Sequence, residues 1–375
     1  MKIMLTGGGT GGHFYPLIAI AQKLNEVGDQ EKIANLKIYY MSDAPYDERA
    51  LFDNKIEFIK VETGKIRLYF SFKNISDIFK TISGVYKGFL KMFKIYPDVV
   101  ISKGGYASFP AVLSAIILRI PIIVHESDSY PGKANLWASK FARRVAVSWP
   151  EAVEYLPKDK TALTGQPIRK EILKGDQNGA FEYFKLSPSI PTILVIGGSQ
   201  GAEKINDIIL DSLPQLLNKY QIIHQTGPNN IIDVSSRAKL IMENNPYIER
   251  YVPIAFLNIN TTKMSAGVSK LIISRAGSAI FEIASWGIPS ILIPITKSNG
   301  NHQKKNAYNY ARTGASKVIE EENLTPHVLI SEIDRLLNDT KKLEEMKNKA
   351  LAFSNPDASL MIAKEAIEIA LTHEE

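Results

Sequence analysis

Strand-length apolar runs alternate with amphipathic helical stretches along the chain, and this alternation limits the fold more than any other feature. The runs of the first half are residues 2–6, 36–41, 56–60, 99–102, 122–125 and 145–148. The rhythm restarts near Thr192, with runs at 192–196, 220–225, 248–251, 271–274, 290–293 and 316–319. Such alternation is typical of α/β domains with mostly parallel sheets. We therefore predict two doubly wound, Rossmann-like domains that face each other across a cleft.

The length supports this division. The chain has 375 residues, and one domain usually takes about 100 to 200. Turn residues at 164–168 separate the two series of runs. We therefore expect one domain over residues 1–166 and a second over 167–355. Pro356 can open a helix within the final segment, 356–375, and we expect that helix to pack back on the first domain.

The amino-acid composition indicates in which cellular compartment the protein works. The chain contains no cysteine, which excludes disulfides, thiolate zinc sites and cysteine nucleophiles, and which fits a reducing compartment. Residues 1–6 suit a first strand better than a signal peptide. The longest apolar stretch, 109–124, is interrupted by Arg119 and Pro121, so it indicates a buried helix and strand rather than a membrane span. We expect a cytosolic protein.

A glycine turn, residues 7–13, follows the first run and precedes an amphipathic helix. Free backbone N–H groups and the helix dipole at such a turn attract phosphate. The spacing also matches the dinucleotide fingerprint, but that motif needs an acid at the end of the second strand, and Asp43 lies too late for it. We therefore favour a phosphate-bearing group other than NAD or FAD and expect no cofactor.

Two further glycine turns occur in the second half, at 197–202 and 274–282. Glycine also serves packing alone in Rossmann-like turns, but turns in both halves suggest two phosphate-bearing groups in one cleft. Glu282 would stabilise the helix dipole and could also accept both hydroxyls of a ribose. Gln303, at the start of a later helix, is well placed to bond the sugar of a nucleotide-sugar.

Two places could supply a base. His13 lies at the positive end of a helix, which keeps an imidazole neutral and able to accept a proton. His125 and Glu126 end a predicted strand and form the second candidate, although a strand-end histidine is more often structural. The chain has no Asp-x-Asp pair and no metal-ligand spacing, so we expect metal-independent chemistry in which backbone N–H groups and Arg169 offset the charge of the leaving group.

Taken together, these motifs resemble the MurG family, which transfers N-acetylglucosamine from UDP-GlcNAc to undecaprenyl-diphospho-MurNAc-pentapeptide. The resemblance is carried in the family's order by residues 7–16, 104–106, 125–135, 165–169, 198–202, 224–227, 274–282 and 302–307. It implies the GT-B fold, inversion at the sugar carbon and attack by the MurNAc 4-hydroxyl while UDP leaves.

The resemblance also implies roles for individual residues. They are Thr10, Gly11 and Gly12 for the acceptor diphosphate or donor sugar, His13 as proton acceptor, Arg169 and Ser199 for the UDP diphosphate, Val252 for the uracil, Glu282 for the ribose and Gln303 for GlcNAc. Three departures from the family's pattern occur. Ser127-Asp128 replaces Gln-Asn, which turns an amide that contacts GlcNAc into a carboxylate that cannot donate. Gln166 replaces an asparagine, and the loop 277–282 is one residue short.

A membrane surface is a further expected partner. From Ile75 to Phe93 apolar residues recur at helical spacing beside lysines, and the aromatic stretch 68–72 precedes them. A helix packed on its own sheet, with solvated lysines, is the more usual cause of such spacing. Aromatics fringed by lysine also suit an anionic leaflet, so we expect peripheral attachment at the cytoplasmic face of the cell membrane. We read the net charge of +6 in this way and expect no nucleic-acid partner.

Three other functions remain compatible with these patterns. A related GT-B transferase could act on diacylglycerol or another lipid. A UDP-GlcNAc 2-epimerase shares the two domains and glycine turns and needs no acceptor. A non-catalytic protein could bind a nucleotide-sugar without turnover.

Overall fold

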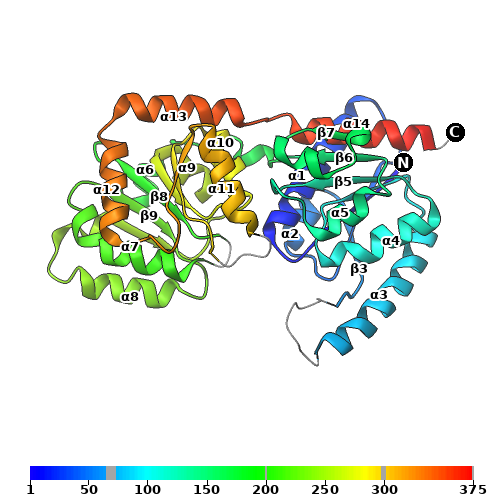
Figure 1. Ribbon diagram of the computed structural model, residues 1–375, viewed down its shortest axis with the longest axis horizontal. Coiled ribbons are helices and arrows are strands. Elements are labelled where there is room, and N and C mark those ends of the chain that lie inside the picture. The colour runs from blue at the N-terminus through cyan, green and yellow to red at the C-terminus, as the bar shows by residue number, and fades with distance from the viewer. Residues whose placement is uncertain (65–72, 199–200, 297–300, 374–375) are drawn as a thin grey trace. The chain divides into compact units, whose positions relative to one another are not determined.

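The computed structural model describes residues 1–64, 73–198, 201–296 and 301–373, with backbone alone at 73–80. The chain forms two compact units (Figure 1). Unit 1 contains Met1–Lys170 and Asn355–Glu375, and unit 2 contains Glu171–Ser354. The division therefore falls just after the predicted boundary, and the chain returns to unit 1 for its final segment.

Unit 1 is built on a seven-stranded sheet in the order β3-β2-β1-β4-β5-β6-β7, with every pair parallel. The strands are β1 Lys2–Thr6, β2 Lys37–Ser42, β3 Ile56–Lys60, β4 Val99–Ser102, β5 Ile122–Glu126, β6 Arg144–Val147 and β7 Thr161–Leu163. The sequence pattern predicted six of these. It missed β7, an edge strand of three residues with little burial.

The helices of unit 1 cover both faces of this sheet (Figure 1). They are α1 Gly11–Gln30, α2 Glu48–Asp53, α3 Lys73–Ile95, α4 Phe109–Leu118, α5 Lys133–Ser139 and α14 Ala358–His373, with short 3₁₀ turns at Tyr106–Ser108, Pro150–Tyr155 and Lys158–Lys160. Helix α14 packs along α1. Its Ile362, Ala366 and Ile367 belong to the same buried core as Leu17 and Leu24 of α1. The last helix is thus part of the first unit.

Helix α3 packs against α4 through small residues. A Cβ on Gly88 would lie 3.2 Å from Pro110 of α4, and one on Gly84 would overlap the carbonyl oxygen of Glu62. Met92, on the same side, is fully buried. The packed face of α3 is therefore formed largely by small residues together with Met92. Its other large apolar side chains at 81–95 lie mainly on other faces of the helix.

Unit 2 contains a six-stranded parallel sheet in the order β10-β9-β8-β11-β12-β13. Its strands are β8 Thr192–Ile196, β9 Gln221–Gln225, β10 Tyr251–Ile254, β11 Ser269–Ser274, β12 Ser290–Leu292 and β13 Ser316–Val318. Ile193 and Val195 of β8 join one apolar cluster, while Leu194 and Ile196 join another. Both faces are buried, which explains why these runs are continuously apolar.

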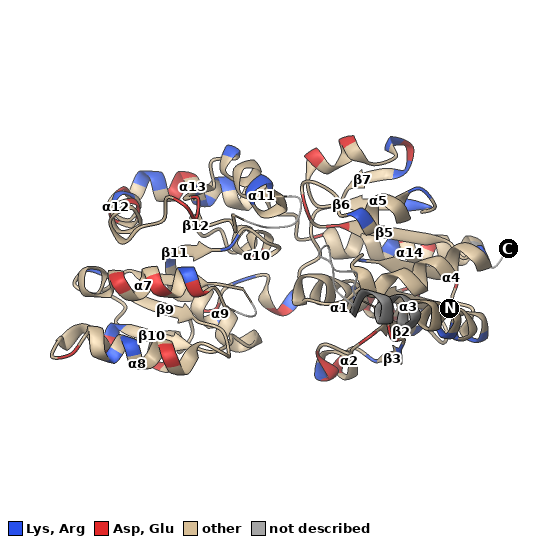
Figure 2. Ribbon diagram, turned by 60° about the horizontal axis from the view of Figure 1, so that its bottom comes forward, with Lys and Arg blue, Asp and Glu red and all other residues tan. Residues whose placement is uncertain are grey.

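Helices pack against this sheet on both sides (Figure 1). They are α6 Ala180–Phe184, α7 Glu203–Leu216, α8 Ile231–Ile241, α9 Ile259–Val268, α10 Ala279–Trp286, α11 His302–Arg312, α12 Pro326–Leu337 and α13 Thr340–Phe353, with 3₁₀ turns at Lys170–Ile172 and Pro246–Arg250. In Figure 2, helices α7, α8, α12 and α13 carry both basic and acidic positions. The outer surface of unit 2 therefore has mixed charge there.

The strand predicted at 248–251 was wrong. Residues Pro246–Arg250 form a 3₁₀ turn, and the strand occupies Tyr251–Ile254. The side chain of Asn245 accepts a hydrogen bond from the backbone N–H of Tyr247, 2.9 Å away, which stabilises the start of the turn. The strand contains Pro253, which lacks an N–H, and this is tolerated because β10 lies at the edge of its sheet.

Candidate active site

Three neighbouring strands of unit 1 end beside one another and carry polar loops. Strands β1, β4 and β5 are adjacent and parallel, so their carboxyl ends meet at one edge of the sheet, where α/β sheets usually bind ligands. The first glycine turn follows β1, Lys103-Gly104-Gly105 follows β4, and Ser127-Asp128 follows β5. The expected acceptor-side residues are therefore gathered in one place.

The first glycine turn and the loop after β4 pass each other closely. Gly105 has φ +82°, and a Cβ there would lie 2.9 Å from the carbonyl oxygen of Gly8. Glycine is required at Gly105 by both conformation and space. The hydroxyl of Tyr106 donates to Asp43 at 2.6 Å, so Asp43 holds this loop, a different task from the ribose contact of a dinucleotide fold.

His13 lies in the first turn of α1 and is half-buried. Its Nδ1 is 2.9 Å from the hydroxyl of Thr10. The pKa of His13 is lowered to about 4, first by burial and second by the positive charge of Lys103, while Asp128 opposes the shift. The imidazole is therefore neutral near pH 7 and can accept a proton.

His125 has a different environment. It is fully buried at the end of β5, and its Nε2 lies 3.1 Å from the carbonyl oxygen of Gly165. Because that oxygen can only accept, Nε2 carries the proton and Nδ1 is the basic nitrogen. Nδ1 is buried, with no hydrogen-bond partner among the described residues. Burial holds the pKa of His125 well below its ordinary value.

Glu126 organises the loop that follows it. Its carboxylate accepts from the backbone N–H groups of Asp128 and Gly132 and from the side-chain amide of Asn135, each at 2.9 Å. Burial raises the pKa of Glu126, and so does the charge of Asp128, whereas Lys103 opposes the rise. These three donors give Glu126 a structural role in positioning Asp128, which is half-buried beside it.

Lys103 is a buried residue of this site that the sequence reasoning did not select. It is 2% exposed, and its ammonium group donates to the hydroxyl of Ser127. Burial lowers the pKa of Lys103 to about 8, while Glu126 and Asp128 oppose that shift. Its position directly after a central parallel strand was the available signal.

Arg169 is held within unit 1 by an aromatic ring. Its guanidinium carbon lies 3.9 Å from the centroid of the Tyr15 ring. The Tyr15 hydroxyl donates to Asp47 at 3.3 Å, and the Tyr15 ring packs edge-on against Tyr46. Arg169 is thus joined to the helix that bears His13, and Tyr15 is a second residue that the sequence reasoning missed.

The second glycine turn follows β8 in unit 2. Gly201 has φ +80°, and a Cβ there would overlap the carbonyl oxygen of Thr226. The side-chain amide of Gln225 donates to the carbonyl of Gly198 at 3.1 Å. The end of β9 therefore fixes this turn from the side. The predicted diphosphate contact Ser199 lies outside the described residues.

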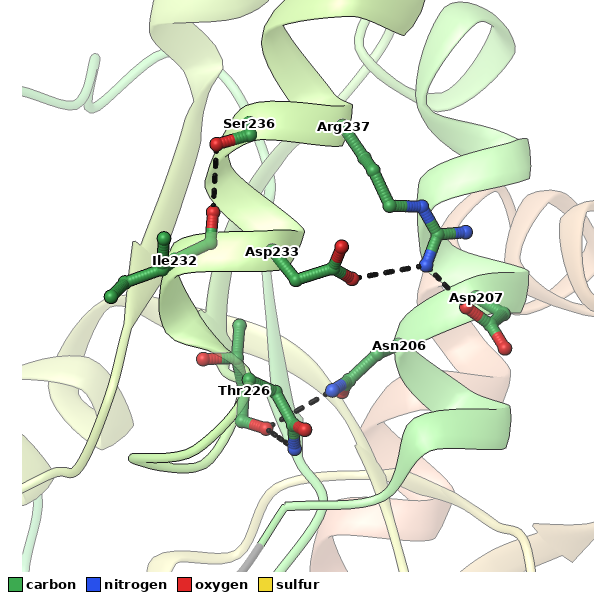
Figure 3. A network of polar contacts seen from close by, with 8 residues as sticks. Asn206, Asp207, Thr226, Ile232, Asp233, Ser236 and Arg237 are labelled. Atoms are coloured by element: carbon green, nitrogen blue, oxygen red, sulfur yellow. Dashed lines mark hydrogen bonds and ion pairs between the residues drawn. The ribbon is translucent and has the colours of Figure 1, made fainter.

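A buried network of polar side chains holds Thr226, the residue whose carbonyl lies against this turn. Asn206 of α7 and Asn230 both donate to the carbonyl of Thr226 at 3.0 Å (Figure 3). His224 lies between Tyr251, whose hydroxyl is 2.8 Å from Nδ1, and Asn206, whose Oδ1 is 3.1 Å from Nε2. His224 is fully buried and has a structural role. Nearby, Arg237 of α8 bridges Asp207 and Asp233 on the surface (Figure 3).

The remaining predicted residues of unit 2 follow neighbouring strands. Glu282 lies in α10 after β11 and is half-buried. Gln303 is the second residue of α11, after β12, and its side-chain oxygen accepts from the backbone N–H of Ile295 at 3.2 Å. Val252 lies in the edge strand β10, partly buried. Arg275 forms an ion pair with Glu321, 2.6 Å away, and therefore has a structural role.

The predicted residues thus divide between the two units. Unit 1 carries Thr10, Gly11, Gly12, His13, His125, Glu126, Asp128 and Arg169, and unit 2 carries Val252, Glu282 and Gln303. Within the described ranges, no cluster of three or more His, Cys, Asp or Glu side chains is arranged to hold a metal ion.

The comparisons with known proteins match both halves. Residues 3–147 match the glycosyltransferase family 28 N-terminal domain, and residues 192–362 match the family 28 C-terminal domain. A protein of Bacillus thuringiensis (strain Al Hakam) is 36% identical over 375 residues, covering 99% of this chain and 98% of its own. It is named UDP-N-acetylglucosamine–N-acetylmuramyl-(pentapeptide) pyrophosphoryl-undecaprenol N-acetylglucosamine transferase 3.

The chain belongs to the MurG family. A Clostridium kluyveri protein named for the same transfer is 38% identical over 339 residues, which is 89% of this chain and 91% of its own. Acinetobacter baumannii MurG has a similar structure, with a TM-score of 0.73 and 24% identity over 98% and 99% of the two chains. A UDP-GlcNAc 2-epimerase from Neisseria meningitidis, bound to UDP-GlcNAc, has a TM-score of 0.69 and 15% identity over 98% and 100%. These likenesses show the two-domain GT-B fold.

Proposed function

We propose that this MurG-family chain transfers N-acetylglucosamine from UDP-GlcNAc to undecaprenyl-diphospho-MurNAc-pentapeptide, a step of peptidoglycan synthesis. The observation that carries the proposal is its 36% identity, over nearly the full length, to a protein named for this transfer. The UDP-GlcNAc 2-epimerase that shares the fold is only 15% identical. Sequence likeness thus favours the transferase over the epimerase.

His13 is the proton acceptor in this proposal. The MurNAc 4-hydroxyl attacks the anomeric carbon, its proton passes to His13, and the bond from that carbon to the UDP oxygen breaks with inversion. His13 is half-buried, neutral and oriented through Thr10. His125 is less suited to this role because its basic nitrogen is buried. Glu126 supports the loop, because three N–H donors already occupy its carboxylate.

The other residues bind the two substrates. Thr10, Gly11 and Gly12 offer the start of α1 to the acceptor diphosphate or donor sugar, since backbone N–H groups there attract anions. Arg169 and the turn containing Ser199 offset the charge that develops on UDP. The binding surface of unit 2 is completed by Val252 for the uracil, Glu282 for the ribose and Gln303 for GlcNAc. Asp128 accepts from a sugar hydroxyl.

The deciding experiment supplies purified protein, without added metal, with labelled UDP-GlcNAc and a short-chain analogue of the MurNAc lipid. We expect a disaccharide lipid and UDP, and we expect His13→Ala and Glu282→Ala to lower the rate by at least about 100-fold. Parallel reactions contain UDP-glucose with diacylglycerol, or donor alone. Product only with diacylglycerol, UDP-ManNAc from donor alone, or UDP binding without turnover would each replace the proposal with another function.

We further propose that unit 1 docks on an anionic membrane surface at the cytoplasmic face. No helix among the described residues is long and apolar enough to span a membrane. The outward face of α3 supports the proposal: Ile82, Tyr86, Leu90 and Phe93 follow one another at helical spacing and are 48% to 65% exposed. We call these four residues the apolar stripe. Helix α3 packs on α4, but these four side chains remain exposed and could meet a partner.

The charge of α3 fits the same partner. Residues 81–95 of this helix contain Lys87, Lys91 and Lys94 and no acidic residue. Lys91 donates to the carbonyl of Lys60 at 2.8 Å, which places one lysine at the edge of the sheet. Basic residues beside exposed apolar ones favour anionic lipid. The predicted aromatic stretch 68–72 lies outside the described residues.

Vesicle sedimentation tests the docking. We expect binding to vesicles rich in phosphatidylglycerol and weak binding to neutral vesicles. Ile82→Glu with Phe93→Glu should abolish binding and leave transfer to a soluble acceptor analogue intact. Ile232→Glu is the matched control, because Ile232 is 81% exposed on α8 of unit 2. Equal binding by the double variant and the control would refute docking through the apolar stripe.

A further inference from the structure

A buried lysine connects two of the three places at which the sequence departs from the MurG pattern described above. The ammonium of Lys103 donates to the hydroxyl of Ser127, and that hydroxyl donates to the side-chain oxygen of Gln166 at 2.7 Å. Ser127 and Gln166 stand where the MurG family usually has glutamine and asparagine. The two departures are therefore parts of one contact, and the lysine is its third member.

The contact continues across the sheet. The same oxygen of Gln166 accepts from Ser148 at 2.9 Å, and the hydroxyl of Ser148 lies 3.3 Å from Nε2 of His125. The loops after β4, β5 and β6 are thus joined by hydrogen bonds to the segment that leads to Arg169. Lys103 is the cation at the end of this series of hydrogen bonds, and Ser127 fixes the orientation of its ammonium group.

The charged groups around Lys103 come from β5, the loop after it and α1. His125 and Glu126 are the last two residues of β5, Asp128 lies in the loop that follows, and His13 belongs to α1. Both carboxylates act on Lys103, and Lys103 acts on both histidines. Its carbon chain packs on the first glycine turn, since a Cβ on Gly7 would lie 3.0 Å from the Cβ of Lys103. The same Cβ on Gly7 would lie 3.4 Å from the carbonyl oxygen of His13, so Lys103 and His13 meet at this turn.

We propose that Lys103 is a positioning residue that holds the Ser127-Asp128 turn in place and, through its fixed charge, adjusts how readily His13 accepts a proton. The inference rests on the proposed role of His13 as proton acceptor. A fixed positive charge disfavours a second positive charge nearby, so the ammonium opposes protonation of the imidazole. Asp128 acts in the opposite direction. The balance between Lys103 and Asp128 therefore shifts the pH below which His13 is already protonated and can no longer accept a proton.

The sign of the effect is fixed by these charges. Burial comes first among the causes that lower the pKa of His13 to about 4, and Lys103 comes second. Lys103 itself has a pKa of about 8, so it is charged throughout the range in which His13 titrates. Removing that charge leaves Asp128 unopposed and raises the pKa of His13. Removing the charge of Asp128 lowers it.

The experiment measures the protonation of His13 directly, by NMR of histidine-labelled protein with the His13 signal assigned from His13→Gln. Lys103→Met keeps the length and removes the charge, and we expect the His13 titration to move up by about one pH unit. Lys103→Arg keeps the charge and should leave it unchanged. Asp128→Asn should move it down. Lys133→Met, at an exposed lysine of the same unit, is the control and should have no effect.

The acid limb of kcat/KM for sugar transfer provides the second readout. We expect it to move with the NMR titration in Lys103→Met and to stay in place in Lys103→Arg. A lysine that served packing alone would lower activity without moving either curve, and that result would overturn the inference. If Lys103→Met does not fold, Lys103→Gln, which also removes the charge, takes its place in both measurements.

Failure of this inference is distinguishable from failure of the proposed function. Wild-type protein that transfers the sugar, with a His13 titration unaffected by residue 103, retains its function and loses the role of Lys103. Wild-type protein without transfer, but with the expected NMR shifts, loses the function and retains the electrostatic coupling.

Discussion

The guanidinium of Arg169 lies over the ring of Tyr15, with 3.9 Å between the guanidinium carbon and the ring centroid. Arg169 follows the Gly165-Gln166-Pro167 turn, whereas Tyr15 lies in the second turn of α1, two residues after His13. The pair therefore joins the proposed diphosphate contact to the helix of the proposed proton acceptor. Tyr15 limits where the arginine can point.

Replacing the ring should weaken donor binding. A cation–π contact contributes about 0.5 to 2 kcal/mol, so we expect Tyr15→Leu to raise the KM for UDP-GlcNAc about 2- to 30-fold with a smaller change in kcat. Tyr15→Phe keeps the ring and removes the hydroxyl bonded to Asp47, and it should be close to wild type. Steady-state kinetics at saturating acceptor measure both. Equal KM values for the two variants would show that the ring does not position Arg169.

Glu126→Gln should destabilise unit 1. The carboxylate faces three N–H donors, and an amide turns one acceptor into a donor that points at another donor. We expect a loss of about 1 to 3 kcal/mol in the free energy of unfolding, measured by urea denaturation. Glu57→Gln, at an exposed position of β3, should change it by less than about 0.5 kcal/mol. A wild-type midpoint for Glu126→Gln would contradict the structural role.

Alanine at two glycines of one turn separates steric overlap from backbone strain. Gly198 has φ +94° with no described atom within 4 Å of an added Cβ, whereas a Cβ on Gly201, at φ +80°, would overlap the carbonyl of Thr226. We expect Gly198→Ala to cost about 1 to 2 kcal/mol through strain, and Gly201→Ala to cost more and to weaken UDP binding further. Calorimetric titration with UDP and thermal unfolding test the order, and the reverse order would be inconsistent with the structure.

His224 should make unit 2 less stable in acid. Burial lowers the pKa of His224 to about 3, against an ordinary value of 6.5, so the unfolded chain binds the proton more readily. The stability contributed by neutral His224 is fully present above about pH 6.5 and is lost as the pH falls toward 3, with a slope of at most about 1.4 kcal/mol per pH unit. Urea unfolding followed between pH 4.5 and 7.5 (about the range in which the unfolded histidine titrates) should show this slope.

His224→Gln should reduce that slope because glutamine does not titrate. It should also lower stability at pH 7, since the bonds to Tyr251 and Asn206 change. His327→Gln, at an exposed histidine of α12 in the same unit, is the control and should leave the slope as it is. A slope in His224→Gln equal to that of wild type would mean that another group is responsible.

Much of the fold could be predicted from the sequence because buried parallel strands are continuously apolar. The runs at 2–6, 56–60 and 192–196 coincide with β1, β3 and β8. The edges of the sheets were harder: β7 is short and mostly exposed, and β10 begins only after a 3₁₀ turn that Asn245 stabilises. Apolar periodicity does not register a capping side chain, so the run at 248–251 was misplaced.

The candidate site shows the same limit. Glycine turns and the histidine beside them are visible as motifs, because their spacing reflects backbone geometry. Lys103 and Tyr15 carry no motif of their own, and their importance comes from contacts with residues far along the chain, such as Ser127 and Arg169. A lysine in a sequence is ordinarily predicted to be exposed to solvent. Its burial here depends on how three loops meet at one edge of the sheet.

Helix α14 gives the chain an order of assembly. Its Ile362, Ala366 and Ile367 lie in the core that also contains Leu17 and Leu24, although more than half of the sequence separates them. During synthesis, α1 leaves the ribosome long before α14 does. The apolar face of α1 therefore stays uncovered by α14 while all of unit 2 is made. Unit 2 is formed by one continuous stretch, so it can complete its core before unit 1, the part of the chain that began first.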